Sequence, residues 1–273
     1  MNDFSEVKYF TGGNYASHDL EGMLNQIFNE DCLEGMKRIP DKSVDMILCD
    51  LPYGTTDCKW DSIIPLDKLW EQYERIVKAD GAIVLTATQP FASLLVSSNI
   101  KLFKYDWIWE KDQGSNFINV KNEPLKKHES ILVFSKGTIA NRSPRRMKYN
   151  PQGLIPCEIK KKNISKRKDG GYLSARENFS DGEYKQEFKN YPSTVLKYQR
   201  DRGLHPTQKP VDMFEYLIKT YTEDGAVVLD NCMGSGTTAV ACVRSGRNFI
   251  GFESDKTHGF YDAALQRVAG EYA

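Results

Sequence analysis

Three short runs of the chain are apolar at nearly every position, and this pattern restricts the fold more than any other feature. They are Val44–Asp50, Ala82–Ala87 and Ala226–Asp230, and each stops at polar or turn-forming residues. Strands that lack polar alternation are typical of parallel sheets covered by helices on both faces. Segments with helical periodicity, 66–77 and 210–221, lie between these runs. The alternation predicts an α/β fold with a doubly wound, mostly parallel sheet.

The first apolar run leads directly into Asp50-Leu51-Pro52-Tyr53, which we call the tetrad. Open parallel sheets bind ligands beyond the carboxyl ends of their strands, which is where the tetrad is expected. Asp50 supplies hydrogen-bond acceptors, Tyr53 offers a flat face for stacking, and Pro52 fixes the backbone without donating an N–H. Acceptors beside an aromatic ring suit a planar group that carries an exocyclic amine. The plainer alternative is a strand that ends in an ordinary turn.

A second candidate site is the glycine loop that follows Asp230. Gly234, Gly236 and Ala239 satisfy the pattern G-x-G-x-x-[GA] between an expected strand and an expected helix. The glycines let a ligand approach the backbone, and the helix N-terminus favours negative charge. Glu253, at the end of the next expected strand, is placed to hold ribose hydroxyls. The loop therefore fits a nucleoside cofactor, and a simple tight turn is the alternative.

Basic residues are concentrated in one part of a chain whose net charge is zero. Residues 137–204 contain 16 Lys or Arg against 7 Asp or Glu, a balance of +9, so the remainder carries −9. A basic segment on an otherwise acidic chain predicts an insert that faces a polyanion, and a surface lobe without a partner is the alternative. Two basic runs lie within it: Lys160, Lys161 and Lys162, then Lys166, Arg167 and Lys168.

One further stretch draws attention by its length. Residues Lys111–Lys127 are polar and lie between two expected strands, 105–110 and 130–134. Connections of this length without secondary structure are uncommon in compact domains unless they are functional. We therefore expect a working loop there.

The chain carries no sign of a membrane span, of secretion or of a metal. It has no run of eighteen apolar residues, and its start lacks the apolar core of a signal peptide. Its six cysteines are scattered without a C-x-x-C pair, which argues against a zinc site and against a disulfide framework. We therefore expect a cytoplasmic protein without a bound metal.

The motifs together resemble those of one enzyme family. The tetrad resembles the Asp-Pro-Pro-Tyr motif of the amino-group DNA methyltransferases, with Leu51 where the first proline is usual. Asp230–Thr238 is similar to the S-adenosylmethionine loop of this family, and His205–Pro210 resembles the segment that precedes that loop. The order of tetrad, basic insert and cofactor loop resembles the β class of these enzymes. Three other stretches also match: Asn29–Leu33, Trp107–Lys111 and His128–Lys136.

The resemblance implies a class I S-adenosylmethionine-dependent methyltransferase with a Rossmann-like, circularly permuted sheet. It implies a catalytic part in residues 26–136, a target-recognition insert in 137–204 and a cofactor-binding part in 205–273. Residues 1–25 form an N-terminal extension without an assigned role. Double-stranded DNA is the implied partner, S-adenosylmethionine the implied cofactor, and a homodimer is expected because many β-class members dimerise.

The resemblance also implies roles for single residues. In the catalytic set of Asp50, Leu51, Pro52 and Tyr53, the Asp50 carboxylate and the Leu51 carbonyl accept hydrogens of the target amine, and Tyr53 stacks on the flipped base. The cofactor-binding set is Asp31, Cys32, Asp50, Thr207, Lys209, Asp230, Gly234, Ser235, Gly236, Thr237, Thr238 and Glu253. The two basic runs would bind DNA phosphates. Plainer alternatives are a helix cap for Asp31, a core thiol for Cys32, and surface charges for Lys209 and Glu253.

The expected reaction is methylation of the N6 amino group of adenine in a specific DNA sequence, as in restriction–modification. An aspartate at the head of the tetrad is common among adenine-modifying members of the family that the chain resembles. N4-cytosine methylation is the first alternative. An NAD-dependent oxidoreductase would account for the glycine loop and Glu253 but not for the tetrad or the basic insert. A DNA-binding protein without catalysis is the last alternative.

Overall fold

The computed structural model describes residues 19–54, 62–162, 183–201, 208–254 and 259–272. Some residues of the expected sites lie outside this part: Thr207 of the cofactor-binding set and Lys166, Arg167 and Lys168 of the DNA-binding set. Most of the N-terminal extension, residues 1–18, also lies outside it.

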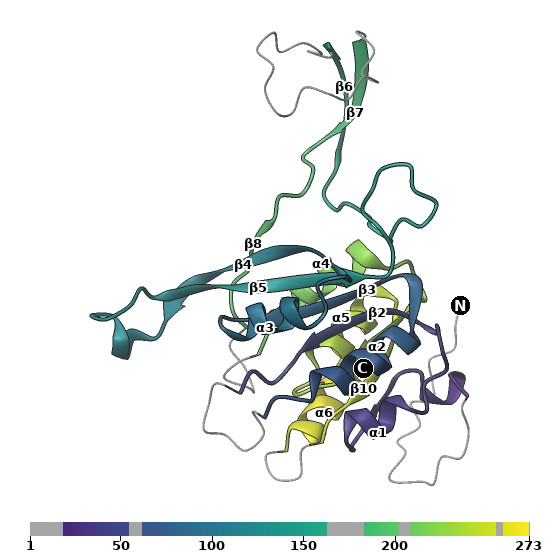
Figure 1. Ribbon diagram of the computed structural model, residues 1–273, viewed down its shortest axis with the longest axis vertical. Coiled ribbons are helices and arrows are strands. Elements are labelled where there is room, and N and C mark those ends of the chain that lie inside the picture. The colour runs from purple at the N-terminus through teal and green to yellow at the C-terminus, as the bar shows by residue number, and fades with distance from the viewer. Residues whose placement is uncertain (1–18, 55–61, 163–182, 202–207, 255–258, 273) are drawn as a thin grey trace.

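An eight-stranded sheet runs through the molecule (Figure 1). Its strands are β1 (Gln26–Phe28), β2 (Val44–Asp50), β3 (Val77–Ala87), β4 (Phe103–Ser115), β5 (Lys126–Ser135), β8 (Val195–Lys197), β9 (Val227–Asp230) and β10 (Asn248–Phe252). Their order in space is β1-β10-β9-β2-β3-β5-β4-β8. Of these strands, β5 alone runs against the rest, because it pairs antiparallel with β3 and β4 while the other pairs are parallel. The expected doubly wound, mostly parallel α/β sheet is confirmed.

Helices cover both faces of the sheet. One face carries α1 (Cys32–Met36), α2 (Leu66–Ile76) and α3 (Phe91–Ser98), and the turn η1 (Glu21–Met23) lies nearby in the chain. The other carries α4 (Val211–Tyr221), α5 (Thr237–Ser245) and α6 (Phe260–Tyr272). Successive residues of β2 enter the two cores alternately, Met46 and Leu48 on one face and Ile47 and Cys49 on the other. This double burial explains why the run is apolar at nearly every position. Within the described residues, no helix has the length and apolarity needed to cross a bilayer.

Strand β3 begins earlier than the sequence pattern predicts. The pattern assigns Val77 to a helix that ends at Asp80-Gly81, whereas α2 stops at Ile76 and β3 begins at Val77. Contacts with β2 explain the difference. Lys78 Nζ pairs with Asp45 Oδ1 at 2.7 Å, and a Cβ on Gly81 would lie 2.6 Å from the Asp45 carbonyl oxygen. Such contacts between strands leave no periodic signal in the sequence.

Part of the basic segment forms an arm of two antiparallel strands, β6 (Ile155–Lys162) and β7 (Glu183–Lys189), which projects from the body (Figure 1). The ends of the segment belong to the body instead. Met147 is buried in the core, and β8 pairs with β4 at the edge of the sheet. The projecting part is therefore shorter than residues 137–204. The sequence did not predict β8, because a strand of three residues is too short to show a periodic pattern.

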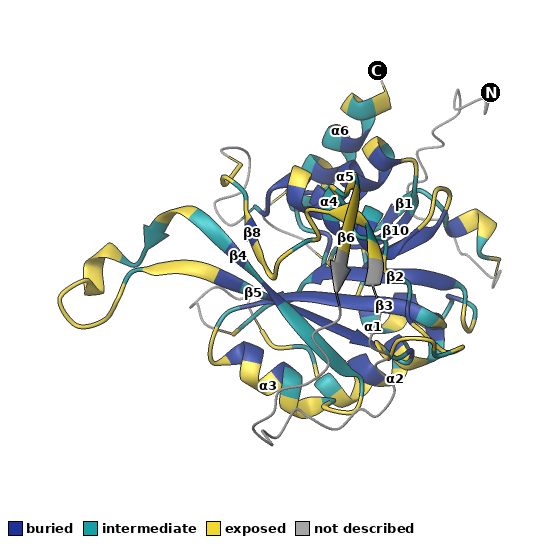
Figure 2. Cartoon of the chain, turned by 90° about the horizontal axis from the view of Figure 1, so that it is seen from above, coloured by how far each residue is buried: buried dark blue, intermediate teal, exposed yellow. Residues whose placement is uncertain are grey.

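The stretch expected as a working loop, Lys111–Lys127, forms the outer end of the hairpin between β4 and β5. β4 extends to Ser115, β5 begins at Lys126, and the 3-10 turn η2 (Phe117–Asn119) lies between them. Figure 2 shows this hairpin projecting from the body, with exposed residues along its outer half. It has no core beneath it, so its strands lack the apolar alternation by which a strand is recognised.

Candidate active site

Asp50 is the last residue of β2, and three side chains hold its carboxylate. Oδ1 accepts hydrogen bonds from the Tyr53 hydroxyl at 2.6 Å and from the Thr86 hydroxyl of β3. Oδ2 contacts Lys209 Nζ at 2.5 Å. The Asp50 side chain keeps 30% of its exposure. A carboxylate offers about four lone-pair positions, so these partners leave Asp50 able to accept one more donor.

Lys209 lies just before α4 and is only 5% exposed. Its Nζ contacts Asp50 and also lies 3.4 Å from Glu129 Oε2 on β5. Glu129 Oε1 pairs in turn with Lys111 Nζ on β4 at 2.5 Å. We call Asp50, Lys209, Glu129 and Lys111 the charge cluster. Its charges alternate in sign and sum to zero, so no member of it is an uncompensated buried charge.

Burial and the charges of the cluster together set the protonation states of Lys209 and Tyr53. Burial alone would lower the pKa of Lys209, but the charges of Asp50 and Glu129 outweigh it and the net shift is upward. Burial, followed by the charge of Asp50, raises the pKa of Tyr53. Lys209 is therefore an ammonium and Tyr53 a neutral phenol at neutral pH, and both donate to Asp50.

The rest of the tetrad is held by packing. The Tyr53 ring is half-buried, with the Phe91 ring on one side at a centroid distance of 5.4 Å. Leu51 is 3% exposed and belongs to the core below the tetrad. Gly54 follows with a φ of +65°, in the left-handed region that favours glycine. Packing of Leu51 thus supplies a constraint at the position where the family's first proline is usual, and Pro52 still fixes its own φ.

The glycine loop between β9 and α5 has the backbone geometry that the sequence predicts. Gly234 and Gly236 have φ values of +54° and +85°. A Cβ on Gly236 would lie 3.1 Å from the Ala264 Cα of α6, so a side chain there would press on that helix. The Gly234 N–H donates to Glu253 Oε2 at 2.7 Å. This bond brings the acid that follows β10 against the loop.

Asp230, the last residue of β9, fixes the start of the glycine loop. Its Oδ1 accepts a hydrogen bond from the Cys232 N–H at 3.0 Å, and its Oδ2 accepts one from the Thr238 hydroxyl. The side chain is buried, and burial raises its pKa to about 6 because the charged form loses its hydration.

The tetrad and the glycine loop lie side by side because β2 and β9 are neighbours in the sheet. Ile47 of β2 pairs with Leu229 of β9, so the two parallel strands end at the same edge, in Asp50 and Asp230. Lys209 reaches this edge from a third part of the chain. An acceptor site, a stacking ring and a nucleoside-type loop thus share one edge of the sheet.

The sequence matches the DNA methylase family of N6 and N4 methyltransferases over residues 44–261, which include the tetrad and the glycine loop. The chain belongs to this family. Type II methyltransferase M.BglII of Bacillus subtilis is 28% identical over 267 residues, which cover 91% of this chain and 70% of that protein. DNA adenine methyltransferase YhdJ of Escherichia coli strain K12 is 29% identical over 268 residues, covering 90% and 84%. The crystal structure of the M1.HpyAVI–SAM complex aligns with a TM-score of 0.58 at 25% identity, covering 89% of this chain and 98% of that one.

In this DNA methylase, the contacts of Asp31 are those of a helix cap and the contacts of Cys32 are those of a core thiol, the alternatives to cofactor binding given above. Asp31 caps α1, because its Oδ1 accepts two backbone N–H groups of the helix at 2.8 and 3.2 Å. Cys32 is buried, and its Sγ lies 3.6 Å from Asn231 Nδ2. The same Asn231 Nδ2 lies 3.5 Å from Cys232 Sγ, so Asn231 links α1 to the glycine loop. In the described part of the chain, no group of three or more His, Cys, Asp or Glu side chains could hold a metal ion.

Two members of the charge cluster, Glu129 and Lys111, escaped the sequence analysis. Both lie in stretches that resemble the family, Trp107–Lys111 and His128–Lys136, which assigned them no role. Alternation along β5 is a further signal for Glu129, since it shares a face with Ile131 and Val133 of the core. The burial of Lys111 depends on the register between β4 and β5.

Arg267 of α6 also escaped the sequence analysis of the methylase. Its Nη1 donates to the Ser235 carbonyl at 2.7 Å and lies 3.4 Å from the Thr237 hydroxyl oxygen. Ser235 and Thr237 are both buried. Their hydroxyls are therefore engaged in holding the glycine loop against α6.

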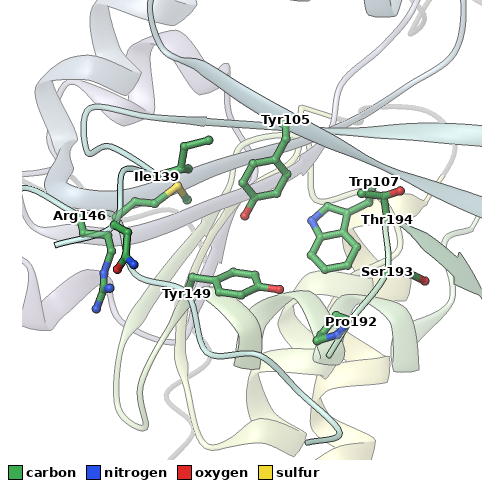
Figure 3. A pocket seen from close by; sticks show the side chains of 10 residues that line it. Tyr105, Trp107, Ile139, Arg146, Tyr149, Pro192, Ser193 and Thr194 are labelled. Carbon is green, nitrogen blue, oxygen red and sulfur yellow. The ribbon is translucent and has the colours of Figure 1, made fainter. Parts of the chain in front are cut away.

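The basic arm and a cavity at its root lie away from Asp50. Lys160 is exposed on β6, and Lys161 and Lys162 continue the same strand. A cavity of about 470 Å³ is lined by Trp107 of β4 and by Tyr149, among others. Figure 3 shows these two side chains from close by. β4 is three strands from β2 in the sheet, so this cavity is separate from the site around Asp50.

Replacing Asp230 by Asn should change how stability depends on pH. The folded-state pKa of Asp230 is about 6 against an ordinary 3.8, so the folded protein binds this proton more tightly than the unfolded chain does. The group's contribution to the free energy of unfolding is therefore largest below about pH 4. It is lost as the pH rises through 6, by up to roughly 3 kcal/mol at 1.36 kcal/mol per pKa unit.

Asn keeps the shape of Asp230 but cannot titrate. The stability of Asp230→Asn relative to the wild type, from urea unfolding, should therefore rise by roughly 2.4 kcal/mol between pH 4 and pH 7. A difference that stays constant across this range would contradict the raised pKa.

Proposed function

We propose that this DNA methyltransferase transfers a methyl group from S-adenosylmethionine to the N6 amino group of adenine within a specific sequence of double-stranded DNA. Family membership supports the reaction class, and the similar structure in complex with SAM supports the cofactor. The observation that carries the adenine assignment is the carboxylate of Asp50 at the head of the tetrad, held beside Tyr53. The similarity to an enzyme named DNA adenine methyltransferase points the same way.

The target amine is a weak nucleophile because its lone pair is delocalised into the base. Asp50 has one lone-pair position left for an N–H of the amine, and the Leu51 carbonyl takes the second N–H. Both bonds favour a pyramidal nitrogen whose lone pair is free to attack. Positive charge develops on this nitrogen as the methyl group arrives, so the bond to Asp50 strengthens in the transition state. The surplus proton then leaves along the hydrogen bond to Asp50, whose exposed side opens to water.

Lys209 serves mainly to position Asp50. Its Nζ lies 2.5 Å from Asp50 Oδ2 inside a closed set of charges, which stabilises the carboxylate and prevents it from turning away. The resemblance places Lys209 and Thr207 at the carboxylate of the cofactor. Thr207 lies outside the described residues, so this second role stays a prediction.

Tyr53 provides the surface for the flipped base. One side of its ring packs on Phe91, and Lys209 Nζ lies over the ring at 5.8 Å from its centroid. We assign the half-buried ring's remaining exposed part to stacking on the base. Stacking against an aromatic ring is worth about 1–3 kcal/mol per base, which offsets part of the cost of taking the base out of the duplex.

The glycine loop and the acids near it fit the cofactor. A Cβ on Gly234 would meet only the Cys232 carbonyl oxygen, at 4.0 Å, so the methionine part of the cofactor can lie against the backbone there. Gly236 instead lets the loop pass close to α6. We assign Glu253 to the ribose hydroxyls, and Asp31 and Cys32 to the adenine ring. When bound, S-adenosylmethionine supplies an activated methyl group. The remaining loop residues of the cofactor-binding set hold the loop in shape: Asp230, Ser235, Thr237 and Thr238.

The division of the chain follows from these roles. Residues 26–136 supply the tetrad, 205–273 supply the glycine loop, and 137–204 read the target sequence through the arm. The exposed Lys160 on β6 supports contact with DNA phosphates. The homodimer and the cytoplasmic location stay predictions, and residues 1–25 have no assigned role.

Asp50→Asn should lower turnover by at least ~10²-fold, a typical cost of removing one electrostatic stabiliser. The amide has nearly the same shape, but it lacks the negative charge that stabilises the developing positive nitrogen. Affinity for S-adenosylhomocysteine, measured by calorimetry, should fall much less. When DNA that the wild-type protein has methylated is digested to nucleosides, mass spectrometry should detect N6-methyladenine.

Tyr53→Phe is the matched control, because it keeps the stacking face and loses only the hydroxyl that contacts Asp50. It should retain more turnover than Tyr53→Ala. Near-normal turnover in Asp50→Asn would overturn the role of Asp50. Finding N4-methylcytosine alone would overturn the choice of base.

Replacing Lys160, Lys161 and Lys162 by Ala should flatten the dependence of DNA affinity on salt. Each phosphate contact that is lost should reduce the slope of log K against log salt by about 0.9. Lys37→Ala and Lys68→Ala remove two exposed lysines, one that follows α1 and one on α2, and serve as controls for a general loss of charge. An equal effect in the controls, or an unchanged slope in the arm variant, would remove this run from the DNA interface.

A further inference from the structure

The hairpin formed by β4 and β5 extends beyond the edge of the sheet at which Asp50 lies. Asp50 pairs with Thr86 of β3, Thr86 with Ile131 of β5, and Ile131 with Trp107 of β4. Trp107 therefore lies level with Asp50 along the strands. β4 continues to Ser115, roughly 25 Å further at about 3.3 Å per residue. β3 ends at Ala87, one residue past this level.

The tip of the hairpin presents apolar side chains to solvent. Phe117, Ile118 and Val120 are 65%, 96% and 50% exposed. They lie in or next to the turn η2 and pack against neither core cluster. Figure 2 shows the tip standing clear of the body. Large apolar side chains gathered at a protruding tip indicate a contact surface rather than a structural role.

The tip is held in shape by its own hydrogen bonds. Asn116 adopts a left-handed φ of +73°, and its side chain bonds to Glu123. Backbone N–H groups of Asn122 and Glu123 donate to the Asn119 carbonyl at 2.8 and 3.0 Å. Phe117 and Ile118 are therefore presented by an ordered turn, so a partner need not order the turn when it binds.

The root of the hairpin is tied to the catalytic edge. Lys111 of β4 and Glu129 of β5 are both members of the charge cluster. Trp109 of β4 donates its indole N–H to the Tyr198 carbonyl at 2.9 Å. The position of the tip relative to Asp50 is thus set by the same contacts that hold the carboxylate.

The charge of the hairpin suits DNA. Residues 111–127 contain four Lys against one Asp and one Glu, a balance of +2. Lys121, Lys126 and Lys127 are exposed beside the apolar tip. DNA must approach the edge at which Asp50 lies if a base is to reach that carboxylate. The hairpin therefore projects toward the side from which the duplex comes.

We infer that the tip of the hairpin, Phe117 and Ile118 above all, inserts into the bound duplex beside the target base and helps that base to leave the stack. Apolar side chains that enter a base step unstack it, and flanking lysines hold the phosphates on either side. This inference rests on the proposed function, because it requires a base that is flipped onto Tyr53. It assigns the tip a role in flipping, separate from the chemistry at Asp50.

The test compares a duplex in which the target base is paired with the same duplex in which an abasic site lies opposite the target base. The recognition sequence is first read by modification-aware sequencing of DNA that the wild-type protein has methylated. An unpaired base leaves the stack at lower cost. Phe117→Ser with Ile118→Ser should lower single-turnover methylation of the paired duplex by at least ~10-fold and affect the unpaired duplex much less.

Ile100→Ser is the matched control. Ile100 is also apolar and 63% exposed, but it lies before the start of β4, at the opposite end of that strand. It should match the wild type on both duplexes. Thermal melting of all variants should be unchanged, because the replaced side chains lie outside both cores.

Suppose that the wild type is active and the tip variant loses activity equally on both duplexes, or on neither. This result would overturn the role of the tip in base flipping and leave the proposed function standing. The tip variant could instead have a lower molecular mass than the wild type by light scattering, with an unchanged ratio of its methylation rates on the two duplexes. This result would identify the tip as a contact between two copies of the chain, and would also overturn its role in base flipping. A wild-type protein that methylates no DNA would overturn both the proposed function and the role of the tip in base flipping.

Discussion

A lysine in the interior of a protein needs negative partners, and Lys209 obtains them from two strands of the sheet. Its side chain is almost wholly buried between Asp50 and Glu129, and Lys111 completes the set with a second positive charge. Loss of one member would leave a buried charge without compensation, which costs far more than the intact set contributes. The four residues are therefore a constraint that the surrounding fold has to satisfy.

This constraint connects parts of the chain that are far apart in sequence. Asp50 ends β2, Glu129 and Lys111 lie on β5 and β4, and Lys209 begins the segment that leads into α4. The cluster therefore joins the strand that carries the tetrad to the strands that form the hairpin and to the part that carries the glycine loop. One set of ion pairs can thus place the catalytic carboxylate and the hairpin that reaches toward DNA. The glycine loop comes beside them through the pairing of β2 with β9.

Strands that are buried on both faces of the sheet could be predicted from the sequence. Structure that depends on contacts between residues far apart in the sequence could not. β2 has the predicted bounds because a doubly buried strand shows itself as an apolar run. The glycine loop was found because its backbone requires glycine at positive φ. The early start of β3 and the hairpin were missed, since pairing with β2 or between exposed strands leaves no periodic pattern. Glu129 and Lys111 lie in stretches that resemble the family, but they were given no role because their burial follows from strand register. Asp50 and Lys209 lie in motifs for which the resemblance implies a role.

The most direct test of the charge cluster is a double-mutant cycle on Asp50→Asn and Lys209→Met, measured as free energies of unfolding. Lys209→Met alone should destabilise the protein by about 3–5 kcal/mol, because two carboxylates then share Lys111 as their one remaining cation in the cluster. The double variant restores a neutral cluster and should be more stable than the sum of the single effects predicts, by at least ~2 kcal/mol. Single effects that add to within about 0.5 kcal/mol would show that the two side chains are not coupled, and would contradict this account of the site.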